Sequence, residues 1–322
     1  MIVKRVSKPI SLIQHEILLK RFICSSSTLD EIQQNKKKIH TGYKGELSLE
    51  FFLSEWNRED GRVFFDLRMD HFQLDIFLLC KNYGVILEVK NIYGKLYFDS
   101  KHQQLLRSTS EGEQGFLYPI AQLNRQQRLF KDWLAKIHLS NLPIHGFVVI
   151  ANSSTIIDSD KALPQVIHAH SLLEKLEVLD RIHKEDILQT RQLNRFTQRL
   201  LEAHQLSYGS ILSKYNLKTR EILIGVECCS CFSFQMKRKN RTWVCDKCGH
   251  KDKTAHLPTI REYVLLHGKN FISNREFREW TGLESIYSAN KLLNRTGFLP
   301  VNEYKTRYYV VPDDFLYSLC QI

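Results

Sequence analysis

The stretch Val85-Ile-Leu-Glu88-Val-Lys90-Asn91 places two charged side chains within a strongly apolar run. A short run of β-branched and aliphatic residues predicts a buried strand. Side chains alternate along a strand, so Glu88 and Lys90 share one face while Val89 points to the other. Charges on such a strand cost free energy unless something uses them. The stretch therefore predicts a chemical site on a sheet; the alternative is an exposed strand with a weak surface ion pair.

The segment before this strand supplies a second carboxylate. Residues 72–80 predict another strand, which carries Asp75, and the turn Lys81-Asn-Tyr-Gly84 joins the two strands as a hairpin that can bring Asp75 beside Glu88. Carboxylate oxygens suit Mg²⁺ or Mn²⁺, and a neighbouring ammonium can orient an attacking water and offset charge on a phosphorane. These groups are the minimum equipment for hydrolysing a phosphodiester.

The surrounding segments predict an α/β sandwich. Helical patterns alternate with strand patterns in the order helix, antiparallel strands, helix, strand. We expect helices opened by Pro9 and by the capping box Thr28-Leu-Asp-Glu31, and further helices at 43–56, 120–137 and within 164–204. The remaining expected strands are 62–68, 95–98 and 146–151.

Four sequence features together resemble the nuclease-related domain (NERD) family. They are the run Gly42-Tyr-Lys-Gly45-Glu46, Leu74-Asp75, the stretch 85–91, and Pro119 followed by Gln122. The family is similar to the PD-(D/E)xK nucleases, and the resemblance covers roughly the first half of the chain. It implies a restriction-endonuclease-like α/β sandwich with a mixed sheet.

The same resemblance implies roles for individual residues. Asp75 and Glu88, together with Val89, would bind Mg²⁺, and Lys90 would be the catalytic lysine. Glu46 would be an additional acidic residue from the preceding helix, and Gln122 a polar group reaching the site from the following helix. Glu46 equally fits an ordinary first-turn carboxylate, and Gln122 a solvent-facing residue. His71 and His102 are expected to be surface histidines.

Two cysteine pairs predict a structural zinc site in a cytosolic, reducing setting. Cys228-x-x-Cys231 and Cys245-x-x-Cys248 are separated by thirteen residues, a spacing that suits four thiolates around tetrahedral Zn²⁺. Cys229 could replace Cys228 only with altered spacing. The aromatic residues between the pairs indicate a small ribbon stabilised by the metal.

The ribbon is strongly basic, which indicates contact with nucleic-acid phosphates. The expected nucleic-acid-binding residues here are Lys237, Arg238, Lys239 and Arg241, with Trp243 available for stacking. The alternative is a solubilising turn in a ribbon that only joins two domains.

The C-terminal segment resembles a winged helix-turn-helix. It has expected helices at 259–266, 273–280 and 285–295, followed by a hairpin between 299–301 and 307–311. The third helix would present Ser288, Asn290, Lys291, Asn294 and Arg295 to the major groove, and the wing would bring Lys305 and Arg307 to the backbone. A protein-interaction module is the alternative. The expected division is a nuclease domain at 1–205, whose first forty residues form a helical flank, a linker at 206–225, the ribbon at 226–254 and the winged helix at 255–322.

Charge and hydropathy narrow the class of protein. The chain has 322 residues, a formal charge of +11 and a pI near 9.2, which favours a polyanionic partner. No apolar run has the length of a membrane span, and charges interrupt the N-terminus, so we expect a cytoplasmic protein without a membrane partner. The sequence thus predicts a Mg²⁺-dependent DNA nuclease with a structural zinc. RNA is the alternative substrate, and a non-catalytic DNA-binding regulator is the alternative function.

Overall fold

The structure is a computed structural model, and it describes residues 1–23, 27–206, 208–303 and 306–318. The chain forms two compact units, each built from two separate segments. The first unit comprises Met1–Lys8 and Lys38–Leu206, and the second comprises Pro9–Lys37 and Ser207–Ile322. The helical flank that we expected to accompany the nuclease domain therefore groups in part with the C-terminal unit.

A six-stranded mixed sheet forms the centre of the first unit. Its strand order is β1-β2-β3-β4-β8-β10, in which β2, β3 and β4 are antiparallel neighbours and the other pairs are parallel. The strands are β1 (Ile2–Lys4), β2 (Arg62–Met69), β3 (Phe72–Leu79), β4 (Gly84–Lys90), β8 (Ile144–Ile150) and β10 (Val166–His168).

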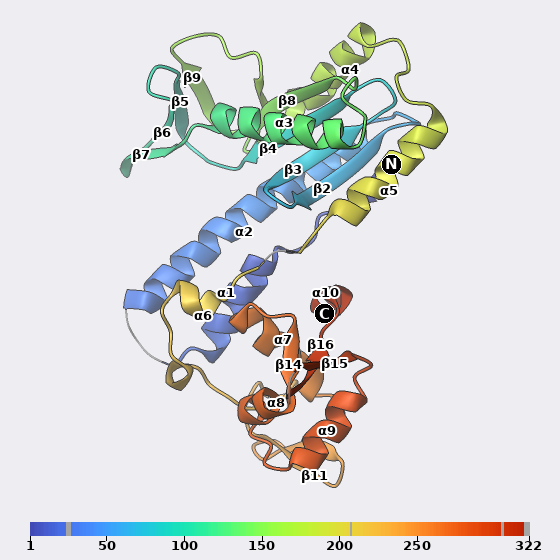
Figure 1. The fold of residues 1–322 in the computed structure, drawn as a ribbon. Coiled ribbons are helices and arrows are strands. Elements are labelled where there is room, and N and C mark those ends of the chain that lie inside the picture. Colours follow the sequence, from blue (N-terminus) through green and yellow to red (C-terminus); the bar gives the residue numbers. More distant parts are fainter. Residues whose placement is uncertain (24–26, 207, 304–305, 319–322) are drawn as a thin grey trace. The chain divides into compact units, whose positions relative to one another are not determined.

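Helices cover both faces of this sheet. One face packs against α3 (Pro119–Lys136) and α5 (Thr190–Ala203), and the opposite face against α2 (Ser27–Ser54) and α4 (Leu172–Ile182) (Figure 1). Along β4, Ile86 belongs to the first core and Leu87 to the second, as the alternation of strand side chains requires. The unit is thus a mixed α/β sandwich of the nuclease-like type that the sequence predicts.

A second sheet of four strands lies in the same unit, in the order β7-β6-β5-β9. Its strands are β5 (Lys95–Asp99), β6 (Gln104–Thr109), β7 (Gly112–Leu117) and β9 (Ile156–Ser159). Only β5 was expected from the sequence, because β6 and β7 are short and rich in polar residues, and neither shows a clear apolar alternation.

Three expectations about the secondary structure were wrong. The segments 28–42 and 43–56 form one continuous helix, α2, which contains Gly45. Glycine is required at this position because a Cβ there would come 2.6 Å from the Cβ of Asn91. Ile2–Lys4 is a strand that pairs with β2 rather than part of a helical flank. Val166–His168 is also a strand, since it completes the edge of the main sheet beside β8.

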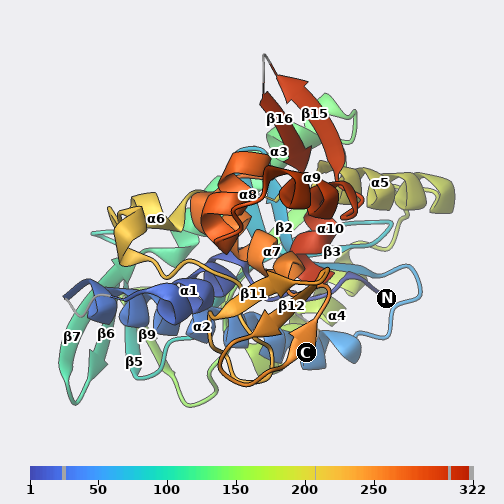
Figure 2. The same cartoon turned by 90° about the horizontal axis from the view of Figure 1, so that it is seen from below.

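The second unit combines a small ribbon with a helical domain. The ribbon strands are β11 (Met236–Lys239), β12 (Thr242–Cys245) and β13 (Lys251–Asp252). The order α7 (His256–His267), β14 (Phe271–Ser273), α8 (Asn274–Thr281), α9 (Ile286–Asn294), β15 (Leu299–Glu303), β16 (Thr306–Val310) is that of a winged helix (Figure 2). The remaining elements are α1 (Ile10–Arg21), α6 (Ile211–Lys214), α10 (Asp313–Ser318) and the 3₁₀ turns Ala169–Ser171 and Thr219–Glu221.

A buried ion pair joins α1 to this unit. Arg21 is fully buried, and its guanidinium lies 2.5 Å from Glu262 of α7 while donating to the carbonyl oxygens of Leu223 and Gly225. The rings of Phe234 and Trp280 lie 4.4 and 4.6 Å from its guanidinium carbon. Within the described residues, no helix is both long and apolar enough to span a bilayer.

Candidate functional site

The β3–β4 hairpin brings Asp75, Glu88 and Lys90 together. The last paired positions of the hairpin are Ile76 and Leu87, so Asp75 and Glu88 are the next residues on their strands. Asp75 Oδ2 accepts a hydrogen bond from the N–H of Val89 at 2.9 Å. The ammonium of Lys90 donates to Glu88 Oε1 at 2.5 Å, and the Glu88 side chain is only 5% exposed. Two carboxylates and one ammonium thus lie together where the pairing of β3 with β4 ends, on two interior strands of the sheet.

Two further carboxylates raise the negative charge of this region. Asp66 lies on β2 across from Asp75, between the paired positions Phe65–Ile76 and Leu67–Leu74. Burial, together with the charges of Asp75 and Asp66, raises the pKa of Glu46 to about 8. Burial likewise raises the pKa of Asp75 to about 7, with the charge of Glu88 as the next cause. A neighbouring cation would therefore be strongly favoured here.

Basic side chains balance only part of that charge. Arg68 and Gln73 donate to Asp66 at 3.0 and 2.7 Å. Lys4 donates to the carbonyl oxygens of Phe65 and Asp66, and burial lowers its pKa. The sequence motif around Glu88 and Lys90 did not predict that Asp66 lies at the site, because the position of Asp66 depends on the register of β2 against β3.

Helix α3 reaches the cluster through Gln126. Its amide donates to Glu88 Oε2 at 2.6 Å, while the amide oxygens of Gln122 and Gln126 are buried and have no hydrogen-bond partner among the described residues. Gln122, the residue expected from the resemblance, lies one helical turn before Gln126. The spacing of four residues in a helix was the available signal for Gln126.

The two histidines near the site are on the surface. The His71 side chain is 79% exposed, and that of His102 is 66% exposed and paired with Asp99.

The donor set fits a hard divalent cation. Carboxylate oxygens and unpartnered amide oxygens are ligands for Mg²⁺ or Mn²⁺ or for waters around them. Among the described residues, the only group of three or more potential ligands within 4.8 Å of one another is the cysteine group. A metal at the acidic cluster would therefore rely on few side chains and keep several waters, as Mg²⁺ commonly does.

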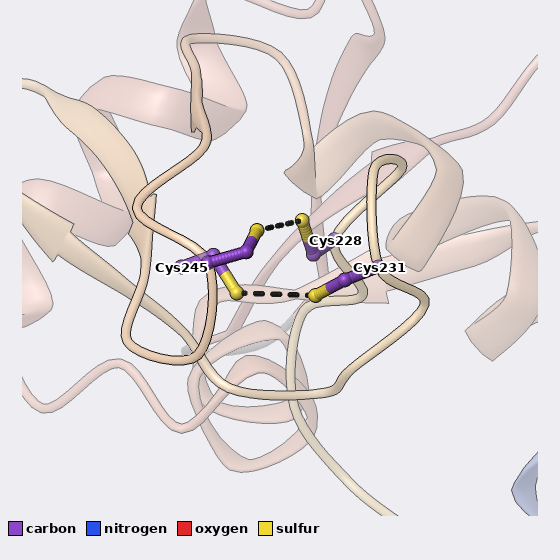
Figure 3. A group of neighbouring side chains, drawn as sticks. Cys228, Cys231 and Cys245 are labelled. Atoms are coloured by element: carbon purple, nitrogen blue, oxygen red, sulfur yellow. Dashed lines mark hydrogen bonds between the residues drawn. The ribbon is translucent and has the colours of Figure 1, made fainter.

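The four cysteines of the ribbon form a compact sulfur cluster. The sulfur atoms of Cys228 and Cys248, and those of Cys231 and Cys245, are 3.6 Å apart (Figure 3). Zn–S bonds of about 2.3 Å in a tetrahedron require sulfur atoms about 3.8 Å apart. The cluster fits a structural zinc ion that is closed to substrate.

The backbone folds each cysteine pair into the same kind of turn. The N–H of Phe232 donates to the carbonyl of Cys228, and the N–H of Gly249 donates to that of Cys245, at 2.8 and 2.9 Å. Phe232 and Gly249 both have left-handed φ angles, of 56° and 72°. Cys229 is exposed, with its sulfur 3.2 Å from His250 Nε2, and is not part of the sulfur cluster.

The basic residues of the ribbon differ in their surroundings. Lys237 and Lys239 are exposed and both pair with Asp246, at 3.0 and 2.8 Å. Arg241 is exposed at the hairpin tip, whereas Arg238 is half-buried.

The expected stacking role of Trp243 was wrong. Its side chain is 1% exposed, and its indole N–H donates to His256 Nδ1 at 3.3 Å. The aromatic ring therefore fills the core beneath the ribbon and cannot stack on a base.

In the winged helix, α9 presents polar side chains to solvent. Arg295 is exposed, Lys291 is half-buried, and Asn294 accepts a hydrogen bond from Tyr309 at 2.8 Å. Half-buried Ser288 lies on its first turn, and Asn290 bonds to Asn274 at 2.7 Å. Arg307 is exposed on β16, while Lys305 lies outside the described residues.

Comparisons with known proteins identify one family. Neither the curated proteins nor the solved structures gave a match. Residues 41–151 match the family model of the nuclease-related domain, and this range includes α2 from Thr41 onward, the β3–β4 hairpin, α3 and β8. The matched range includes Glu46, Asp75, Glu88 and Lys90, so these residues lie in the part of the chain that is similar to the nuclease-related domain.

Proposed function

We propose that the protein is a metal-dependent nuclease that hydrolyses phosphodiester bonds of DNA. The observation that carries the proposal is that Asp75, Glu88 and Lys90 lie together on β3 and β4, within the range that matches the nuclease-related domain. Asp75 and Glu88 would hold Mg²⁺ or Mn²⁺ together with Val89, and the bound metal would supply a Lewis acid for the phosphate.

The other side chains of the cluster have separate roles in catalysis and in binding the metal. The ammonium of Lys90 orients the attacking water and offsets the negative charge that grows on the phosphate. Gln126 holds Glu88 by its hydrogen bond, and the amide oxygens of Gln122 and Gln126 are acceptors for waters at the site. Glu46 adds a carboxyl group from α2, and a bound cation would favour its ionised form, which its raised pKa of about 8 otherwise disfavours.

The C-terminal unit would hold the substrate. We assign the structural zinc to residues 226–254 and DNA contact to this ribbon and to the winged helix at 255–322. A linker at 206–225 would join them to a nuclease domain at 1–205, from which Pro9–Lys37 are excluded because they group with the second unit. The contacts with phosphates would come from Lys237, Arg238, Lys239 and Arg241 of the ribbon and from Lys291 and Arg295 of the winged helix. The net charge of +11 favours such binding.

The decisive experiment compares Lys90→Ala with the matched variant Lys101→Ala on supercoiled plasmid. Lys101 is an exposed lysine outside the cluster. The parent protein and Lys101→Ala should nick the plasmid with Mg²⁺ or Mn²⁺ and stop when chelator is added. Lys90→Ala should lower the cleavage rate at least about 100-fold, as loss of one charge-stabilising group does in related chemistry.

Undiminished cutting by Lys90→Ala would remove the assignment of this lysine. Tight, salt-sensitive binding by the parent without any nicking would favour a regulator instead. Cleavage of a structured RNA in place of the plasmid would change the substrate class.

A further inference from the structure

A groove lies within the second unit, between the ribbon strand β11 and the turn that joins α8 to α9. Its volume is about 630 Å³, within the range of ligand pockets of about 300–1,000 Å³. Lys237 and Arg238 line one side, and Gly282, Ser285 and Ser288 line the other. The groove therefore combines basic side chains of the ribbon with the first turn of the helix expected to contact DNA.

The guanidinium of Arg238 lies over the ring of Trp243, 5.6 Å from its centre, but one of its nitrogen atoms has no hydrogen-bond partner among the described residues. This atom, Nη1, is buried. Burial lowers the pKa of Arg238, and the charge of Arg295 lowers it further, so two cations lie near each other. A buried donor without an acceptor costs about 1–3 kcal/mol, which an incoming anion would remove.

The first turn of α9 adds donors on the opposite side. Ser285 caps the helix by accepting a hydrogen bond from the N–H of Ser288 at 3.2 Å. This cap takes up the N–H of Ser288, so Ser285 and Ser288 offer the groove their hydroxyl groups, and the positive end of the helix dipole favours an anion there. Gly282 ends α8 with a φ of 71°, a conformation in which glycine leaves the groove open.

Two acidic side chains modify the charge of the groove. Glu284 is part of its lining and opposes an anion. Asp246 pairs with Lys237 at 3.0 Å, which leaves Arg238 and Arg295 as the main source of positive potential. The remaining groups favour a single phosphate held by directed N–H donors rather than a broad charged surface.

We propose that this groove binds one phosphate of a nucleic-acid backbone, held between Arg238 and the first turn of α9. The inference rests on the proposed function and deepens it, because it makes the ribbon and the winged helix one DNA-holding site. A phosphate fixed there sets the register of the strand relative to α9.

The test measures binding of the full chain carrying Lys90→Ala to a fluorescein-labelled 30-base-pair duplex over a range of salt concentrations. In this background, Arg238→Gln should weaken the Kd about tenfold and reduce the salt slope by about one. Lys251→Gln removes one exposed charge from the same ribbon, outside the groove, and should change the Kd less than about threefold.

A second pair of variants separates binding from folding. Ser285→Asp and Ser285→Asn both keep a good N-cap for α9, but only aspartate adds a negative charge to the groove. Aspartate should weaken binding about tenfold and asparagine less than twofold, with unchanged zinc content.

Equal affinities of the Lys90→Ala protein with and without Arg238→Gln or Ser285→Asp would overturn the inference. A loss of affinity in Lys251→Gln as large as that in Arg238→Gln would also overturn it. If the protein with Lys90 intact cuts plasmid while these variants bind DNA with unchanged affinity, the proposal of a phosphate-binding groove is wrong and the proposed nuclease activity is supported. If the protein with Lys90 intact does not cut plasmid but the variants lose affinity, the phosphate-binding groove is supported and the proposed nuclease activity is wrong.

Discussion

Single residues at the acidic cluster have ionisation behaviour that depends on their neighbours. A buried carboxyl beside other carboxylates favours its neutral form, so Asp75 and Glu46 have raised pKa values of about 7 and about 8. Sequence alone identified both side chains but not this coupling, because it arises from burial and from Asp66 on a neighbouring strand.

The raised pKa of Asp75 predicts a pH-dependent stability. A carboxyl whose folded pKa exceeds its unfolded value destabilises the fold as pH rises, from about 4 until the folded pKa of about 7 is passed. Without metal, Asp75→Asn should therefore raise the Tm at pH 8 by about 2–4 °C and leave it nearly unchanged at pH 4.5. Differential scanning calorimetry in chelator measures both values.

Added Mg²⁺ provides the control for this prediction. It should raise the Tm of the parent at pH 8, since it binds the ionised site of the folded chain, and should not raise that of Asp75→Asn. An Asp75→Asn protein that is less stable than the parent at pH 8 in chelator would contradict the account.

At the scale of the element, the ribbon depends on metal more than on a core. Its strands contain two to four residues each, too few to bury a large apolar surface, and Trp243 is its largest buried side chain. The sulfur cluster and the two knuckle turns supply the constraint that packing cannot.

Removing one cysteine ligand should unfold the ribbon alone. Cys231→Ser is expected to lose the zinc ion, because three thiolates and a hydroxyl bind it more weakly, and to expose Trp243. The matched control is Cys229→Ser, because Cys229 lies in the same ribbon but outside the sulfur cluster, and this variant should retain zinc. Metal content per chain by mass spectrometry and the fluorescence maximum of tryptophan measure the two outcomes, and loss of zinc in Cys229→Ser would show that the ligand set is wrong.

At the scale of the whole molecule, the chain forms its units from segments distant in sequence. Arg21 of α1 and Glu262 of α7 form a buried pair, so the N-terminal helix belongs to the same unit as the winged helix. Breaking such a pair leaves a buried charge uncompensated, although Lys20 also contacts Glu262.

Arg21→Met should therefore destabilise the second unit selectively, by about 3 kcal/mol. Hydrogen exchange should speed up in α1 and α7 and stay unchanged in β3 and β4 of the first unit. Arg5→Met, which removes a largely exposed pair with Glu50, should change stability by less than about 0.5 kcal/mol. Uniform loss of protection across both units would contradict the division into two units.

Patterns of short range were readable from the sequence, and these covered much of the fold. Apolar runs located β2, β3, β4 and β8, the helical pattern at 273–280 located α8, and cysteine spacing identified the sulfur cluster. The continuous α2 was missed because two glycines in a helix look like an ending, and only the close approach of Asn91 explains Gly45.

By itself, the amino-acid sequence determined which side chains can perform the chemistry, since Asp75, Glu88, Lys90 and the four cysteines follow from local spacing. Only the tertiary structure decided their surroundings. Register across β2 and β3 brings in Asp66, the phase of α3 brings in Gln126, and packing buries Trp243. The physical reason is that spacing along the chain specifies neighbours only within one strand, turn or helix. Contacts between elements depend on packing and register, which no single segment contains.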